Sequence, residues 1–228
     1  MFIMKKILIT LFTICIAQTF AAKATPEQWI AKANGVLKEQ PRISSKYIYP
    51  GLEPSSVFEA SAILDSATKE YPYRIDMWLG QVQLFGEINE CGMQSKFFDK
   101  INTLLKTKKD KCELAGGKKI NKAEKLLEGE FTIVIRKYFD LEYDSCYEYM
   151  SRQMYKLLPN SVEALNAMSI HYMLQKNDSA LALLERANKI APTDCIVLSN
   201  LALYYKRKGN TKKEDEYKKK QDLFCKEK

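Results

Sequence analysis

The stretch 180–205, ALALLERANKIAPTDCIVLSNLALYY, decides the fold of this chain. Ala180, Leu184 and Ala187 recur at i, i+4 and i+7, which places them on one stripe of a helix. Pro192 then ends that helix, because proline lacks an amide donor and clashes with the preceding turn. Small alanines on the stripe let a neighbouring helix come close, so the pattern predicts a helix that packs against other helices.

A second helix follows this proline. Its apolar and small residues again fall on one side, at Leu198, Leu201, Ala202 and Tyr205. Gly209 and Asn210 mark the turn that ends it. The stretch therefore predicts two consecutive helices joined by a short turn.

The same spacing occurs twice more upstream. One copy is Ala60, Leu64, Ala67 and Pro72, and a weaker copy is Tyr147, Ser151, Met154 and Pro159. A second helical pattern follows each of these prolines as well. Repetition of a helix pair at a period near 33 residues indicates a stacked array rather than a single central core.

These segments resemble tetratricopeptide repeats. The family's bulky–x2–Leu–small–x2–Tyr helix is matched by Leu198, Leu201, Ala202 and Tyr205, and its Ala–x3–Phe–x2–Ala–x4–Pro helix by Ala180, Leu184, Ala187 and Pro192. A degenerate copy of the first helix runs Phe131, Val134, Ile135 and Tyr138. The resemblance is strongest over 160–210. It implies an all-α superhelix, or solenoid, of about five helix pairs over residues 23–228.

Two insertions interrupt the pattern. Residues 41–55 contain Pro41, Pro50, Gly51 and Pro54 and are expected to be non-helical. Residues 106–125 carry eight lysines against three acidic residues, and Gly116-Gly117 breaks any helix there. Loops of this length in a compact domain are either functional or disordered.

The first 22 residues predict a secretory signal peptide. Lys5 and Lys6 form a basic start, and Ile7–Ala17 is an uncharged, mostly apolar run of 11 residues. Small residues at 19–24 offer cleavage sites. The run is shorter than the roughly 20 residues of a membrane-spanning helix, although an uncleaved anchor is the alternative. The mature protein is therefore expected to be exported, either periplasmic or secreted, without an integral membrane span.

Five cysteines remain after removal of the leader, which contains Cys15. In an oxidising compartment five cysteines suggest two disulfides and one remaining thiol. If helices over about 195–208 and 212–225 are antiparallel, Cys195 and Cys225 lie level at one end of the pair. Cys91 and Cys146 both fall at turns inside helix pairs, hence on one edge of the stack, and are the second candidate pair. Cys112 is then the remaining thiol. The alternative is that some or all of them are small buried apolar residues.

Motifs for catalysis, cofactors and metals are missing. The sequence contains no P-loop, GxGxxG, GxSxG, HExxH or EF-hand spacing, and no CxxC. The single histidine, His171, is expected to be a surface or inter-helix hydrogen-bonding residue. The acidic residues over 140–148 lack the glycine and ligand spacing of a calcium loop. We therefore expect no cofactor and no enzymatic activity; the alternative is an enzyme that uses the inserted loops.

The charge of +8 arises from 36 basic and 28 acidic side chains. Lysines interspersed with acidic residues, as over 206–228, usually form a solvated helix face. A nucleic-acid groove would show aromatic residues interleaved with arginine, whereas the basic residues here are nearly all lysine. No nucleic-acid partner is expected. Weak contact with anionic lipid or glycan through the lysine-rich faces stays open as an alternative.

The resemblance implies a partner-binding groove lined by the first helix of each pair. At the corresponding positions the chain carries Gln83, Arg136, Asn166, Ile170, Ser199 and Lys206. Some members of the family grip a terminal carboxylate with paired lysines and asparagines. Asn200 fits one asparagine position, but Ile196 and Asn166 occupy the lysine positions, so that activity is not expected. The expected function is a scaffold that holds a segment of another envelope or secreted protein.

Overall fold

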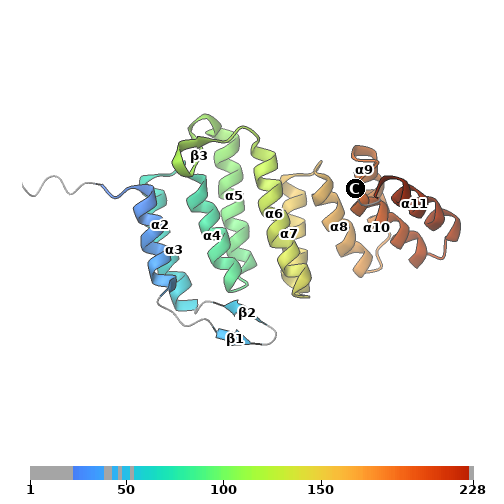
Figure 1. Ribbon diagram of the computed structural model, residues 1–228, viewed down its shortest axis with the longest axis horizontal. Coiled ribbons are helices and arrows are strands. Elements are labelled where there is room, and N and C mark those ends of the chain that lie inside the picture. The colour runs from blue at the N-terminus through green and yellow to red at the C-terminus, as the bar shows by residue number, and fades with distance from the viewer. Residues whose placement is uncertain (1–22, 39–42, 46–47, 52–53, 226–228) are drawn as a thin grey trace, which may run out of the picture.

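A computed structural model describes residues 23–38, 43–45, 48–51 and 54–225. The predicted leader, 1–22, lies outside the described residues. The α-helices are α2 (Pro26–Lys38), α3 (Pro54–Glu70), α4 (Ile75–Glu87), α5 (Cys91–Thr107), α6 (Ala123–Asp140), α7 (Asp144–Leu157), α8 (Val162–Leu174), α9 (Ser179–Ile190), α10 (Cys195–Arg207) and α11 (Thr211–Phe224). They stand side by side in one row from α2 to α11 (Figure 1).

Consecutive helices form five pairs, α2/α3, α4/α5, α6/α7, α8/α9 and α10/α11. The prediction of an all-α, tetratricopeptide-like array of about five pairs is confirmed. The prolines act as predicted, since α3, α7 and α9 each end two residues before Pro72, Pro159 and Pro192. The residues of the Ala180 and Ala60 stripes are buried, because a neighbouring helix covers each stripe.

Both insertions form small hairpins. The first, β1 (Ile43–Ser45) and β2 (Ile48–Gly51), lies inside the first pair; the second combines β3 (Glu113–Leu114) and β4 (Lys118–Lys119) with short 3-10 turns, and lies between the second and third pairs. They lie at opposite ends of the helices (Figure 1). Gly116 and Gly117 have φ of 68° and 74°, a backbone conformation that glycine adopts without strain. The first insertion is shorter than expected, because Pro54 starts α3 rather than preceding it.

An aromatic stack joins α5 and α6 beyond the second insertion. The rings of Phe98 and Phe131 stack at 3.7 Å between centroids and 14° between planes, and both side chains are 0% exposed. This stack belongs to a cluster of buried apolar residues that continues from α4 to α8. The aromatic pair therefore carries the core across the interruption in the repeat.

A buried polar chain crosses the same junction. The Tyr138 hydroxyl donates to Gln94 Oε1 at 2.6 Å, and Gln94 Nε2 donates to the Val82 carbonyl at 2.8 Å. Burial raises the pKa of Tyr138, so its hydroxyl remains a donor. A Cβ at Gly86 would lie 2.7 Å from Gln94 Nε2, so the glycine leaves the space that this amide occupies. The network links α4, α5 and α6.

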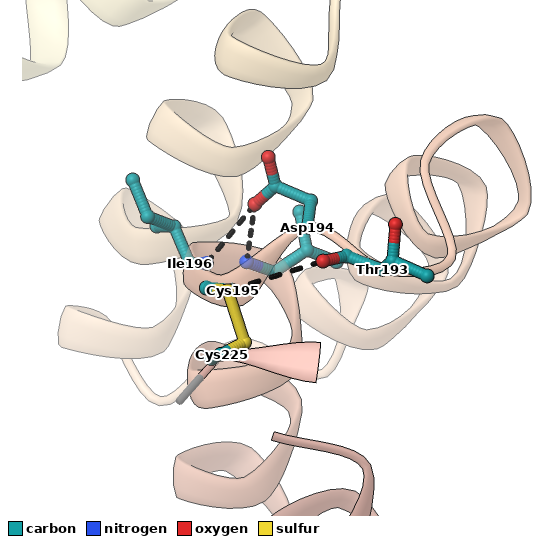
Figure 2. Close-up of a disulfide and its surroundings, with 6 residues drawn as sticks. Thr193, Asp194, Cys195, Ile196 and Cys225 are labelled. Carbon is teal, nitrogen blue, oxygen red and sulfur yellow. Dashed lines mark hydrogen bonds between the residues drawn. A yellow bond between two sulfur atoms is a disulfide. The ribbon is translucent and has the colours of Figure 1, made fainter. Parts of the chain in front are cut away.

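Two disulfides connect helices of the array. Cys91 at the start of α5 bonds to Cys146 in the first turn of α7, and Cys195 at the start of α10 bonds to Cys225 just after α11. These are the pairs that helix geometry predicts from the sequence, and Cys112 is buried and unpaired. Figure 2 shows the second bridge beside Asp194, whose carboxylate accepts from the backbone N–H groups of the first turn of α10. The first disulfide joins the second pair to the third, and the other closes the last pair.

Replacing Phe131 by alanine is expected to lower the free energy of unfolding by about 3–5 kcal/mol, because the cavity would lie at the junction. The matched control is Phe139→Ala on the same helix, whose side chain is half exposed. Urea unfolding followed by circular dichroism measures both. Equal losses in the two variants would contradict a special role of the aromatic stack.

Removal of the Cys91–Cys146 bridge by a double alanine variant is expected to cost about 2–4 kcal/mol of stability, since it closes a long loop of chain. Amide hydrogen exchange should increase in α5, α6 and α7. The control, Cys195→Ala with Cys225→Ala, should increase exchange in α10 and α11 instead. Exchange that rises evenly along the array in both variants would show that neither bridge acts locally.

Candidate partner-binding groove

Two hollows open along the faces of first helices of successive pairs, and a third, of about 500 Å³, opens at the ends of α8 and α10. Of the first two, one, of about 510 Å³, lies between α2 and α4; the other, of about 250 Å³, lies between α6 and α8. First helices of neighbouring pairs share one face of the array, so both hollows lie on that face. We call this face the groove. It is the surface that the tetratricopeptide resemblance predicts for partner binding.

Helical spacing brings the walls of the α6–α8 hollow together. Thr132, Arg136 and Phe139 follow at i, i+4 and i+7 on α6, and Glu163, Asn166 and Ile170 at i, i+3 and i+7 on α8. Ile196 of α10 completes the rim. Below them lie the buried residues Ile135, Met154 and Ala167. The Tyr147 hydroxyl donates to the Ala167 carbonyl at 3.0 Å and holds α7 to α8.

Several large apolar side chains in the groove remain open to solvent. Phe139 is 52% exposed and Ile196 is 56% exposed, while Ile170 is half-buried between them. Leu203 follows Ile196 by seven residues, hence two turns later on the same face of α10, and it is also exposed. Grouped apolar surface with a polar rim is typical of a binding site, whereas isolated exposed residues are ordinary. The arrangement therefore indicates a ligand with apolar side chains.

Arg136 supplies the charge in this hollow. Its guanidinium makes no ion pair with any residue that the structure describes. Glu163 on the facing wall makes no ion pair with Arg136 in the described part of the chain, and burial together with the neighbouring carboxyl of Glu128 raises its pKa. The hollow thus presents an unpaired guanidinium beside apolar side chains, with Glu163 as the acidic residue of its lining.

Asn166 connects this hollow to the next pair. Its Oδ1 accepts from Asn200 Nδ2 at 2.6 Å, which links α8 to α10. The Asn166 Nδ2 donates to no residue in the described part of the chain. Because the hydrogen bond to Oδ1 fixes the orientation of the Asn166 amide, its Nδ2 keeps one direction. Its two N–H groups can therefore donate to a ligand.

The predicted groove residues fall into three groups. Arg136, Asn166 and Ile170 come together in the α6–α8 hollow, Gln83 lines the α2–α4 hollow, and Ser199 and Lys206 are exposed on α10 outside both. Sequence reasoning missed Phe139, which lies three residues after Arg136 on the same stripe. It noted Ile196 only as a departure from lysine. Counting one more turn along α6 would have found Phe139, whereas the place of Ile196 in this hollow depends on how α10 packs against α8.

His171 lies between α7 and α8 and is only 4% exposed. Its Nε2 lies 3.3 Å from Arg152 Nη2 and 3.5 Å from Glu148 Oε1. A neutral ring accepts a hydrogen bond from Arg152, and burial lowers the His171 pKa in the direction that keeps the ring neutral. The inter-helix hydrogen-bonding position expected for this residue is therefore the one observed.

The described part of the chain shows neither a metal-binding cluster nor a membrane-spanning helix. Within the described ranges, no group of three or more His, Cys, Asp or Glu side chains could hold a metal ion. None of the described helices combines the length and apolar character needed to cross a membrane.

Comparison with known proteins gives structural neighbours only. No protein-family model matches the chain, and no curated protein sequence matches it. A crystal structure of MamA is 15% identical, with a TM-score of 0.45, over 73% of this chain and 87% of the other. YrrB, described as a TPR protein with an unusual peptide-binding site, is 16% identical, with a TM-score of 0.45, over 92% and 90%. A MamA fragment from Desulfovibrio magneticus RS-1 is 12% identical, with a TM-score of 0.45, over 90% and 97%. Similarity at this level carries no information on function.

Stability should fall as the pH drops through about 6.5, the usual pKa of histidine in an unfolded chain. The unfolded state then binds a proton that the buried His171 resists, because its native pKa is lowered. His171→Gln should remove this component, so that its unfolding free energy changes less than that of the wild type between pH 7.5 and 5.5. Parallel pH profiles for the two proteins would contradict the assignment.

Proposed function

We propose that the protein is an exported scaffold that holds an extended segment of another envelope or secreted protein in the groove. One observation carries this proposal. On three successive first helices, α6, α8 and α10, the exposed Phe139 and Ile196 and the half-buried Ile170 lie around the unpaired Arg136. Stacked helix pairs suit such ligands, because their shared face is continuous over several repeats.

The groove favours a segment with spaced apolar side chains and one carboxylate. Apolar side chains would fill the space beside Ile170 and Ile196, and the carboxylate would meet Arg136, which binds such groups with paired hydrogen bonds. The N–H donors of Asn166 suit a backbone carbonyl. Because most of this contact is apolar, binding should persist at high salt.

Two further features support this proposal. Disulfides form and persist in oxidising compartments, so the two bridges agree with export. A binding role also fits His171 better than catalysis does, because its buried ring is occupied by Arg152 and Glu148 rather than facing a hollow.

The test is capture of partners from the native envelope fraction with the mature protein, at low and high salt, followed by mass spectrometry. Ile196→Asp and Arg136→Glu should each reduce recovery of a salt-resistant partner by roughly tenfold or more, since burial of one isoleucine is worth about 1.5–3 kcal/mol. The matched control is Ile190→Asp on α9, which changes an isoleucine of similar exposure, 51%, that lines neither hollow.

A synthetic peptide with the sequence of the recovered segment should then bind the wild type and the Ile190 control equally well. It should bind the Ile196 and Arg136 variants more weakly. Loss of capture in the Ile190 variant as large as in the Ile196 variant would contradict a groove-specific site. Recovery that disappears at high salt would contradict an apolar one.

A further inference from the structure

A separate hollow lies at the ends of α5 and α6, next to the second insertion. Its volume is about 460 Å³, and its lining residues come from the end of α5, the start of α6, the 3-10 turn at Lys109 and the N-cap residue Lys122. Leu105 and Leu127 form a buried apolar side. None of its lining residues belongs to the two hollows of the groove.

Lysines dominate this lining. Lys106, Lys109, Lys122 and Lys125 surround the hollow, and Glu124 is the one acidic residue among its lining residues. None of these five side chains forms an ion pair with a residue that the structure describes. Lysines elsewhere, such as Lys137 and Lys208, do have acidic partners. The lining therefore carries a net charge of +3 (four lysines less one glutamate) that the described chain does not neutralise.

The same hollow contains the start of α6, a helix of 18 residues. Its N-cap is Lys122, whose side chain makes no capping hydrogen bond. The backbone N–H groups of residues 123–125 find no acceptor in the described part of the chain. Such a terminus attracts anions, because its free N–H groups and the helix dipole point the same way. Lysines in a first turn are unfavourable unless an anion is present.

Asn102 gives an independent indication of a ligand. Its side chain is only 8% exposed, it lines the hollow, and it makes no hydrogen bond with the residues that the structure describes. The Asn102 side-chain N and O atoms are not among the fully buried polar atoms that lack a partner, so the amide faces the open space of the hollow and is free to bind a ligand there. An acceptor held in the hollow would satisfy its Nδ2.

We propose that this hollow binds a phosphate group, either the free ion or the phosphate of a lipid or sugar headgroup. The donors are the N–H groups that begin α6, the Asn102 amide and the surrounding ammonium groups. Inorganic phosphate or a phosphate monoester matches them with several acceptor oxygens and a charge of about −1.5 to −2, whereas a carboxylate or a phosphodiester headgroup brings one charge and two free oxygens. The hollow is larger than a phosphate ion, and its apolar side at Leu105 and Leu127 can contact the group that bears the phosphate.

The experiment is calorimetric titration of the purified protein with inorganic phosphate and with glycerol 3-phosphate, together with co-sedimentation with phosphatidylglycerol vesicles. One saturable site is expected. Lys122→Gln with Lys125→Gln should weaken it about tenfold or more, as expected for loss of contacts to a charged ligand. The control, Lys189→Gln with Lys212→Gln, removes the same charge from exposed lysines outside the hollow and should leave the affinity unchanged.

Glu124→Gln removes the opposing charge and should strengthen binding, so a variant that merely misfolds cannot mimic the full pattern. Tighter binding of glycerol 3-phosphate or vesicles than of inorganic phosphate identifies a headgroup, and equal affinity identifies the free ion. Absence of a saturable site, or equal weakening in the Lys189/Lys212 control, overturns the proposal. The groove variant Ile196→Asp should bind phosphate normally, which separates this test from that of the groove.

Discussion

Each helix pair of this protein can bury its apolar stripe only against a neighbouring pair. The small residues at Ala60, Ala67, Ala180 and Ala187 make that contact close, and all four are fully buried. Stability in such an array is the sum of pair and interface contributions, so the weakest interface limits the whole. In this chain the second insertion interrupts the interface between the second and third pairs.

The structure reinforces that interface in three ways. Phe98 and Phe131 stack across it, Tyr138 and Gln94 hydrogen-bond across it, and the Cys91–Cys146 bridge joins its two sides. A buried hydrogen bond between two side chains specifies their relative position more closely than apolar contact does, because a shift would leave both unsatisfied. The α6–α8 hollow begins directly after this junction, so the same contacts hold its first wall in place.

The two proposed binding surfaces depend on different interactions. The groove exposes apolar side chains with a single arginine, so its contacts depend mainly on burial of surface and are insensitive to salt. The hollow at the start of α6 exposes lysines and free N–H groups, so its contacts weaken as salt screens them. They also lie on different parts of the helices, on the faces of first helices in one case and at helix ends in the other. A partner protein and a phosphate group could therefore bind without competing.

The helices of this chain, their ends and their buried sides can be deduced from its sequence. The spacing of alanine and leucine assigns the buried side of each helix, prolines mark where helices end, and the level positions of Cys195 and Cys225 at one end of a helix pair indicate their bond. Distances between residues on different helices depend instead on how far each helix is rotated and shifted against its neighbour. Packing of large side chains decides that offset. Only the tertiary structure could therefore bring Ile196 of α10 to the same hollow as Arg136 and Phe139 of α6 while leaving Ser199 and Lys206 outside. It likewise placed the unbonded amide of Asn102 beside lysines that the sequence showed merely as a solvated run.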